Sequence, residues 1–297
     1  MSAITFSRVS PGSTVQDEGR PGKRVYGAAA GGPMDRGAFL EGGRLLTEKA
    51  GSAALELGML GADFTYAGAG AQMAVSGGDF KILINGQQRG WPGLHQLEDG
   101  DRVEITTGQS GLYGYARFDR EIDIEPVMGS RSANLMAGLG GGALTAGDRI
   151  GFLQASNSPP GDTSGSPWLE GPIRVLPGLH ASLLGSRWAD LFDADFEITS
   201  RFDRMGIRLN DRNGFFAEFD AGSLVSDFVV PGDVQILGDG TPVILMRDHQ
   251  PTGGYPRVAT VISAELDRLA QMRPGTRLQF QPATLAEAQR LARGGAA

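Results

Sequence analysis

The chain has 297 residues, enough for one or two domains, and a formal net charge of -7 at pH 7. This negative balance argues against nucleic acid or an anionic membrane as the main partner, and the lack of Cys excludes disulfides, thiolate metal sites and cysteine nucleophiles. No segment approaches the roughly 20 apolar residues of a membrane span, and the N-terminus has no signal-peptide pattern. We therefore expect a soluble cytoplasmic protein.

The N-terminal half predicts one helix among short strands. Asp35 could cap a helix that runs to Leu46. The apolar segment 80–84 leads into Asn85-Gly86, which is the strongest short signal for a β-hairpin. Alternation along 101–106 predicts a further strand with one buried face.

The clearest break in the chain is the segment 155–167, which is polar and rich in Pro, Gly and Ser. Such a composition without periodicity is typical of a surface linker. A strand-like segment, 173–176, begins the second half. We predict two β-rich lobes, residues 1–160 and residues 161–297.

The C-terminal half continues in the same manner. Segments 234–237 and 243–246 flank Asp239-Gly240 and predict a second hairpin. A short helix is expected after Ser263, and Thr284 with Glu287 forms a capping box for a terminal helix. The 46 Gly and 16 Pro, spread along the chain, imply many turns. The predicted fold class is mainly β, with a few short helices.

The segment 203–209 is the first candidate site. If it is extended, Arg204 and Arg208 share one strand face. Two guanidinium groups at this spacing could clamp a carboxylate or a phosphate through bidentate hydrogen bonds. The alternative is a solvated strand face, because half-exposed strands commonly alternate charged and apolar residues.

The segment 248–256 is the second candidate site. Asp248 could act as a base or bind a metal, and three further side chains could orient an amide or carboxylate of a substrate: Gln250, Thr252 and Tyr255. The backbone N–H groups of Gly253 and Gly254 could approach an anion closely. The alternative is a tight Gly- and Pro-containing turn with a capping Asp.

Polar residues of the N-terminal half are weaker candidates. Asp17 and Arg20 lie in one loop and could pair, and Arg131 lies in a small polar turn where it could bind an anion. A surface turn explains Arg131 equally well. The three His residues have no metal-ligand spacing, so no metal site is predicted. There is also no Walker-type nucleotide motif and no lysine context for biotin attachment.

A series of motifs nevertheless carries a family resemblance along nearly the whole chain. The motifs are T-V-Q-D-x-G-R-x-G at Thr14 to Gly22, G-P-M-D at Gly32 to Asp35, A-A-L-E-L at Ala53 to Leu57, G-S-R-S at Gly129 to Ser132, D-R-M-G-x-R-L at Asp203 to Leu209, P-G-x-x-Q at Pro231 to Gln235, and D-x-Q-x-T-G-G-Y-P at Asp248 to Pro256. In order and spacing the chain resembles the biotin-dependent-carboxyltransferase-like family, also called allophanate hydrolase subunit 2. The resemblance implies cyclophilin-like β-barrels in both lobes.

The same resemblance implies a function. Chains of this size are most similar to the C-type subunit of ATP-dependent 5-oxoprolinase, which acts with a B-type subunit of related fold and an A-type subunit to open 5-oxoproline to L-glutamate. ATP would then be shared with the partner subunits. One alternative is a carboxyltransferase component of a urea-carboxylase-like system, which would need biotin on a separate carrier. Another is a non-catalytic regulatory binding protein.

The motifs also suggest which residues act. We expect catalytic roles for Asp248, Arg204 and Arg208. We expect substrate binding by Gln235, Gln250, Thr252, Gly253, Gly254, Tyr255, Arg131, Asp17 and Arg20.

The sequence departs from the family pattern at four places. His249 replaces an Arg, Pro251 replaces a Thr, Gly42-Gly43 lacks the usual Asn, and Phe118-Asp119 replaces a Gly-Gly pair. The change at His249 removes a permanent charge, and the imidazole charge would depend on pH.

Overall fold

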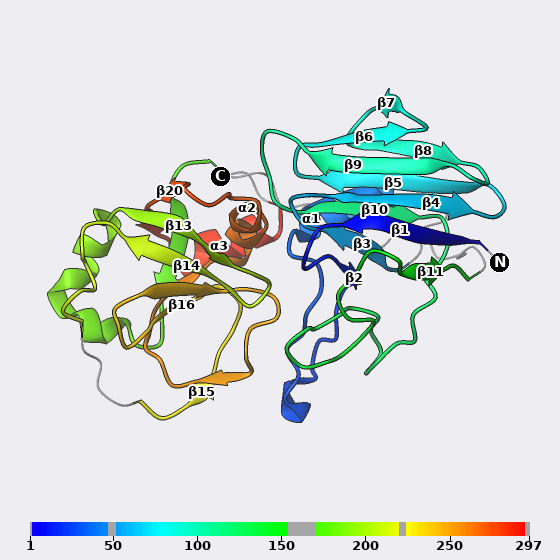
Figure 1. The fold of residues 1–297 in the computed structure, drawn as a ribbon. Helices are drawn as coiled ribbons and strands as arrows, with labels where there is room; N and C mark the ends of the chain where they lie inside the picture. The colour runs from blue at the N-terminus through cyan, green and yellow to red at the C-terminus, as the bar shows by residue number, and fades with distance from the viewer. Residues whose placement is uncertain (1, 47–51, 154–169, 220–223, 295–297) are drawn as a thin grey trace. The chain divides into compact units, whose positions relative to one another are not determined.

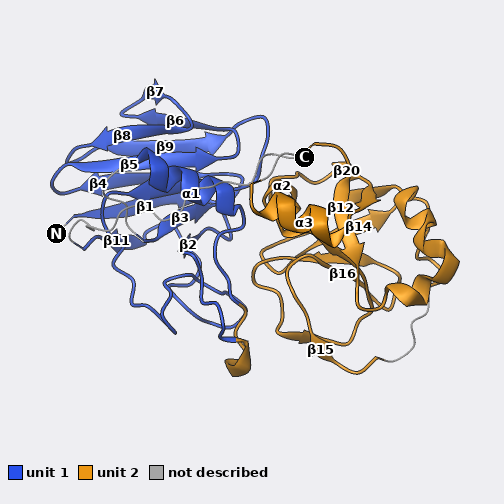
Figure 2. Ribbon diagram, turned by 180° about the vertical axis from the view of Figure 1, so that it is seen from behind, with its two compact units in different colours: residues 1–23, 30–165 blue, residues 24–29, 166–297 orange. Residues whose placement is uncertain are grey.

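The computed structural model describes residues 2–46, 52–153, 170–219 and 224–294. Its contacts divide the chain into two compact units (Figure 2). Unit 1 holds Met1–Lys23 and Ala30–Gly165, and unit 2 holds Arg24–Ala29 and Ser166–Ala297. The predicted linker 155–167 and the predicted boundary at residue 160 both lie outside the described residues.

Unit 1 is built from two antiparallel sheets (Figure 1). One sheet has the order β11 (Arg149–Gly151), β1 (Ala3–Val9), β4 (Ala62–Ala67), β9 (Arg102–Thr107), β6 (Phe80–Ile84) and β7 (Gln87–Arg89). The other has the order β2 (Thr14–Gln16), β3 (Ala54–Leu57), β10 (Gly114–Phe118), β5 (Ala71–Gly77) and β8 (Gly93–Leu97). Apolar residues of both sheets form a single buried core that includes Phe6, Phe64, Met73, Ile105 and Phe118.

The hairpin predicted at Asn85-Gly86 is confirmed. Strands β6 and β7 pair, with Ile84 opposite Gln87, and Asn85 and Gly86 form the turn between them. Both turn residues have positive φ, 53° for Asn85 and 76° for Gly86, as a type I′ turn requires. The right-handed twist of the flanking strands favours this turn over its mirror image.

The predicted N-terminal helix is also confirmed, as α1 (Arg36–Leu45), and is preceded by the short helix η1 (Arg24–Tyr26). The Asp35 carboxylate accepts a hydrogen bond from the backbone N–H of Ala38 at 2.9 Å, which satisfies a free donor of the first turn. Helix α1 packs against β5 and β10.

Close packing against Arg117 explains why position 43 is glycine. A Cβ at Gly43 would lie 2.6 Å from Nη1 of Arg117, so any side chain here would displace the guanidinium group. That group lies 4.3 Å from the ring centroid of Phe39 and donates to the Phe39 carbonyl oxygen at 3.2 Å. Burial lowers the pKa of Arg117 to about 10, which still leaves it charged at neutral pH.

Unit 2 is organised around one strongly curved sheet (Figure 1). Its strand order is β20 (Arg277–Leu278), β13 (Phe196–Phe202), β14 (Gly206–Asp211), β17 (Pro242–Leu245), β16 (Asp233–Ile236), β19 (Arg257–Val261), β12 (Ile173–Pro177) and β21 (Phe280–Pro282). The first and last strands of this order are separated in the chain only by Gln279, so the sheet forms a nearly closed barrel. A small separate hairpin pairs β15 (Asp227–Phe228) with β18 (Thr252–Gly253).

Helices are few and short in unit 2. They are η2 (Ala181–Trp188), η3 (Asp190–Phe192), η4 (Ser263–Glu265), α2 (Leu266–Ala270) and α3 (Leu285–Ala292). The predicted cap is present, because the Thr284 hydroxyl accepts from the backbone N–H of Glu287 at 3.2 Å. The predicted mainly-β fold class is confirmed. No helix in the described ranges is both long enough and apolar enough to span a bilayer.

Candidate functional site

Arg204 lies in the turn between β13 and β14 rather than on a strand. The Asp203 carboxylate accepts hydrogen bonds from the backbone N–H groups of Met205 at 2.7 Å and Gly206 at 3.2 Å, and this closes the turn. Strand β14 begins only at Gly206. The prediction that an extended segment places Arg204 and Arg208 on one strand face is therefore wrong, because Asp203 bends the backbone first.

Arg204 instead forms a buried ion pair with Asp248. Its Nε lies 2.8 Å from Oδ2 of Asp248 and its Nη2 lies 2.9 Å from Oδ1, and the two side chains are 7% and 3% exposed. The backbone N–H of Asp248 also donates to the Arg204 carbonyl oxygen at 2.7 Å. The bidentate pair holds the start of the 248–256 loop against the β13–β14 turn.

Four neighbouring strands of the barrel place three polar side chains and one Val in one row. Arg208 on β14 is opposite Val243 on β17, Val243 is opposite Gln235 on β16, and Gln235 is opposite Arg257 on β19. Directly opposed residues project from the same face of a sheet. Neighbouring strands are about 4.8 Å apart, so the Arg208 and Gln235 backbones are separated by about 10 Å. We call this row the Arg208–Arg257 face.

The centre of the Arg208–Arg257 face carries two amides. Gln250 Nε2 donates to Gln235 Oε1 at 3.2 Å, and Gln235 is only 1% exposed. Nε2 of Gln235 has no hydrogen-bond partner among the described residues. A Cβ on Gly253 would lie 2.7 Å from this nitrogen, so the close approach of β18 to Gln235 requires glycine. Thr252, exposed on the same strand, pairs with Phe228 of β15.

The two arginines at the ends of the face differ in their contacts. Arg257 is 7% exposed, its Nη2 lies 3.1 Å from Oδ2 of Asp227, and it also donates to the Phe228 carbonyl oxygen, so it fastens the β15–β18 hairpin. Arg208 is half-buried, and its side chain has no ion pair or hydrogen bond within the described part of the chain. Its charge does act on exposed Asp239, whose pKa is lowered mainly by hydrogen bonds with Thr241 and to a smaller extent by Arg208. Arg257 was not predicted as a site residue, although it directly follows the D-x-Q-x-T-G-G-Y-P motif.

Two aromatic side chains, one in the 248–256 loop and one in the β15–β18 hairpin, are exposed. Tyr255 is 46% exposed and Phe228 of the hairpin is 58% exposed. A Cβ on Gly254 would lie 3.2 Å from the Leu224 carbonyl oxygen and 3.4 Å from the Ser226 hydroxyl. The aromatic side chains are therefore available for contact with a ligand, whereas Gly254 packs against its neighbours.

His249 is buried beside Asp248. It is 2% exposed, and its Nδ1 lies 2.6 Å from the Gln250 carbonyl oxygen. Burial lowers the pKa of His249, and the opposing effects of the Gln250 carbonyl and of the nearby carboxylates do not overcome it. His249 is therefore mainly neutral at pH 7.

In unit 1, Asp17 is enclosed by the 129–132 turn. It is 8% exposed and accepts hydrogen bonds from the Ser132 hydroxyl at 2.7 Å and from the backbone N–H of Arg131 at 2.6 Å. The Asp17 carboxylate also accepts hydrogen bonds from the Ser130 hydroxyl and from the backbone N–H of Gly19. Burial alone would raise the pKa of Asp17, but these hydrogen bonds outweigh it and lower the pKa.

Arg20 and Arg131 belong to the same arrangement. Arg20 is 1% exposed and donates to the carbonyl oxygens of Ser132 and Val127. Nη1 of Arg131 lies 3.6 Å from Glu121 Oε2 and 3.3 Å from the Ser52 hydroxyl. Through Glu121 and Ser52, Arg131 ties this turn to the segments that follow β10 and precede β3.

The structure thus describes two groups of predicted site residues, one in each unit. Unit 2 brings together Arg208, Gln235, Gln250 and Gly253, with Arg204 and Asp248 fixing the loop. Unit 1 brings together Asp17, Arg20 and Arg131. No cluster of three or more His, Asp or Glu that could hold a metal is found within the residues described.

Comparison with known proteins agrees with the motifs. The family model for the carboxyltransferase domain, subdomains A and B, matches residues 26–282. The chain is 32% identical to the C-type subunit of 5-oxoprolinase from Escherichia coli over 93% of its own length and 90% of that protein. It is 29% identical to the corresponding 5-oxoprolinase subunit of Haemophilus influenzae over 98% of its own length and 94% of that protein.

Solved structures show the same fold within larger proteins. The urea amidolyase of K. lactis superposes with a TM-score of 0.85 at 25% identity, over 98% of this chain and 19% of that chain. The Kluyveromyces lactis urea carboxylase gives the same TM-score and covers 98% of this chain and 28% of that chain. This chain therefore spans less than a third of either solved protein.

Proposed function

Because the chain belongs to the carboxyltransferase domain family, subdomains A and B, we propose that it is the C-type subunit of an ATP-dependent 5-oxoprolinase-type amidohydrolase. The observation that carries this proposal is the 32% identity to a C-type 5-oxoprolinase subunit across nearly the full length of both proteins. The complete enzyme would contain a B-type subunit of related fold and an A-type subunit. ATP would bind at a site shared with these partners.

The chemistry explains why ATP is required. An unstrained five-membered lactam is a poor electrophile, and transfer of the γ-phosphoryl group of ATP to the lactam oxygen makes the ring carbon more reactive. Water then adds to that carbon and the C–N bond breaks, which leaves the phosphoryl group on the new carboxyl as an acyl phosphate. A second water hydrolyses this acyl phosphate, so that one ATP and two waters yield ADP, phosphate and L-glutamate. Positively charged groups stabilise the negative charge that spreads over the transferring phosphoryl oxygens.

The Arg208–Arg257 face of unit 2 has the groups for such a substrate. We assign Arg208 to a substrate carboxylate, because its guanidinium group has no ion-pair partner in the described chain. The half-buried amide of Gln250 would hydrogen-bond to the lactam, and the buried amide of Gln235 would hold Gln250 in position. Thr252 and Tyr255, both exposed beside them, would complete the contacts with the substrate.

The buried pair of Arg204 and Asp248 has a positioning role in this proposal. It fixes the loop that carries Gln250, and both of its charges are engaged internally. In unit 1, Asp17 and Arg20 hold the 129–132 turn, and they would bind substrate only through the loop that they shape. Arg131 would contribute through the same turn.

The decisive experiment is reconstitution. The chain would be purified alone and together with B-type and A-type 5-oxoprolinase subunits from the same organism, and 5-oxoproline-dependent release of phosphate from ATP would be measured. We expect turnover only in the assembled complex. Rapid turnover by the isolated chain, or a stable complex without any dependence on 5-oxoproline, would overturn the proposal.

A second candidate reaction is carboxyl transfer. It is favoured by the close structural match to urea carboxylase, at a TM-score of 0.85. A carboxylated biotin on a separate carrier would then donate its carboxyl group to urea or another amide, and the same arginine would bind that carboxylate. Incorporation of labelled bicarbonate into the amide, dependent on a biotinylated carrier, would establish this reaction instead.

A further inference from the structure

Arg257 joins the small β15–β18 hairpin to the barrel. Strand β15 consists of Asp227 and Phe228, and both residues contact the Arg257 guanidinium group. Oδ2 of Asp227 lies 3.1 Å from Nη2, and the Phe228 carbonyl oxygen accepts a hydrogen bond from Nη1. The backbone N–H of Arg257 donates to Nδ1 of His180 at 3.1 Å, which fixes the strand beneath the hairpin. The contacts of one side chain therefore decide how firmly β15 is held.

Two carboxylates of different character lie beside Arg257. Asp233 is 4% exposed, its Oδ2 lies 3.7 Å from Nη1, and its Oδ1 accepts from the Thr260 hydroxyl at 2.8 Å, so it is a fixed part of the barrel. The Asp227 side chain is 56% exposed. The pKa of Asp227 is lowered first by the backbone N–H of Phe228 and then by Arg257, so this carboxylate is charged at neutral pH. Asp227 is therefore the partner that solvent and ligands can reach.

The contact with Asp227 uses one of the two donors on its side of the guanidinium group. Arg204 shows the full arrangement, because its Nε and Nη2 bind both oxygens of Asp248 at 2.8 Å and 2.9 Å. In Arg257 only Nη2 reaches Asp227, and the buried Nε has no hydrogen-bond partner among the described residues. A buried donor without a partner is unfavourable. An oxyanion that bridged Nε and Nη2 would satisfy a donor that Asp227 leaves unpaired.

A second unpaired donor lies next to the first. Gln235 is directly opposite Arg257 on the neighbouring strand, is 1% exposed, and its Nε2 also has no partner in the described chain. Directly opposed side chains project from the same face of a sheet. Gly253 of the hairpin covers the amide, since a Cβ there would lie 2.7 Å from Nε2. Two donors without partners therefore lie side by side beneath one hairpin.

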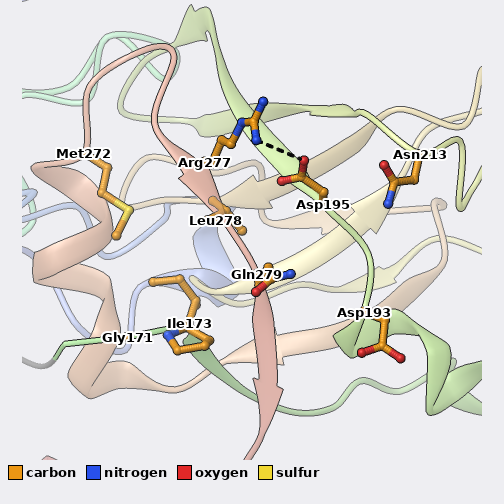
Figure 3. Close-up of a pocket in the computed structure, with 10 residues that line it drawn as sticks. Gly171, Ile173, Asp193, Asp195, Asn213, Met272, Arg277, Leu278 and Gln279 are labelled. Atoms are coloured by element: carbon orange, nitrogen blue, oxygen red, sulfur yellow. Dashed lines mark ion pairs between the residues drawn. The ribbon is translucent and has the colours of Figure 1, made fainter.

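Arg277, in the pocket shown in Figure 3, is an arginine in the opposite situation. Its Nη1 lies 3.9 Å from Oδ2 of Asp195, and its side chain is 65% exposed. Water stabilises the charge of Arg277, so an exchange of carboxylates there would gain little. The Arg257 side chain is 8% exposed, and its charge depends on anions rather than on water. Displacement of Asp227 would therefore favour a replacement anion at Arg257.

We propose that Asp227 is an internal stand-in for a ligand oxyanion, and that a carboxylate or phosphoryl group binds Arg257 in its place. The ligand would bridge Nε and Nη2, and Asp227 would turn into solvent, to which it is already exposed. Strand β15 would then be released and Gln235 uncovered. This inference deepens the proposed function by adding an anion position at the end of the face opposite Arg208, and it rests on that function only for the identity of the ligand.

The first test is hydrogen exchange of the full chain, measured by mass spectrometry. Asp227→Asn removes the charge that holds β15, so segments 225–229 and 250–254 should exchange at least about tenfold faster, while β16 and β19 keep their rates. The side chain is exposed, so the variant should fold. Asp190→Asn, at another exposed aspartate of unit 2, is the matched control and should exchange like the wild type.

The second test identifies the anion. Inorganic phosphate and acetate would be titrated into the full chain at constant ionic strength, with NMR signals of β16, β19 and the Arg257 Nε–H as the readout. With the internal competitor removed, Asp227→Asn should bind at least one of these anions about tenfold more tightly than the wild type. Phosphate and acetate distinguish a phosphoryl ligand from a carboxylate ligand. Adding Arg257→Lys, which lacks the second donor, should remove most of that gain.

Three results would overturn the inference. They are unchanged hairpin exchange in Asp227→Asn, equal affinity of that variant and the wild type for both anions, and undiminished binding after Arg257→Lys is added. Neither measurement requires partner subunits or 5-oxoproline. A negative result here would leave the oxoprolinase assignment standing, and failure of the reconstituted enzyme would leave these binding results unaffected.

Discussion

Arg204 and Arg208 lie four residues apart, yet the structure treats them in opposite ways. Arg204 is 6% exposed and its guanidinium group binds both carboxylate oxygens of Asp248. Arg208 begins a row of side chains across the barrel and has no ion pair in the described chain. One arginine is committed to the fold, and the other is available to a ligand.

The difference shows how burial decides the role of a charged residue. A charge removed from water must be compensated within the protein, so Arg204 and Asp248 are tied to each other. A half-buried guanidinium keeps part of its hydration and can exchange it for a ligand anion. The same logic separates Arg257, fastened to Asp227, from Arg208 at the other end of its row.

The largest effect on stability is expected when Arg204 is removed. Arg204→Ala should destabilise the protein by about 3–5 kcal/mol, because it leaves the Asp248 charge buried without its partner. Urea unfolding followed by circular dichroism would measure the loss. The double variant Arg204→Met, Asp248→Leu removes both charges and should recover a large part of the stability. A loss below about 1 kcal/mol in Arg204→Ala would show that the pair is not structurally important.

The local elements were predictable because their signals are short-range. The Asn85-Gly86 turn, the Asp35 cap and the Thr284 cap each depend on residues within four positions, and all three are present. The prediction that Arg204 and Arg208 share one strand face was also wrong for a local reason. It assumed an extended backbone through 203–205, whereas the Asp203 side chain stabilises a turn there.

The long-range pairs could not be predicted from spacing. Arg204 meets Asp248 across 44 positions, and Gly43 owes its identity to Arg117, which is far away in the chain. Arg257 was overlooked because only the barrel register places it opposite Gln235. The family resemblance indicated segments that the barrel brings together, but it could not say which of their residues are buried and paired.

A second test concerns the amides between the two ends of the Arg208–Arg257 face. Gly253→Ala should destabilise the protein by about 1–3 kcal/mol, because its Cβ would lie 2.7 Å from Nε2 of Gln235 and the amide would have to move. Gly238→Ala is the control, since a Cβ there meets nothing within 4 Å. Equal stability of the two variants would mean that Gln235 is not held in its observed position, and thermal unfolding would measure this.

A third test uses the pH dependence of the free energy of unfolding, because His249 is buried and its pKa differs between the folded and unfolded chain. Its pKa is lowered by burial, so the unfolded chain takes up the proton first as the pH falls through about 6.5. Stability from neutral His249 is complete above that pH and is lost as the pH falls toward the lower folded pKa. Between pH 7 and pH 5 the wild type should lose more stability than His249→Gln. Identical slopes in denaturant titrations would contradict this assignment.

The smallest expected change in stability is at Arg208, and it sharpens the comparison most. Arg208→Gln should change the free energy of unfolding by no more than about 0.5 kcal/mol, because no described ion pair is broken. In the assembled enzyme the same variant should lower turnover about tenfold or more, since a charge-assisted contact with the substrate is lost. Arg201→Gln, at an exposed position of neighbouring β13, should leave both quantities unchanged. If Arg208→Gln instead destabilises the protein as much as Arg204→Ala, both arginines serve the fold and the row across the barrel is not a binding face.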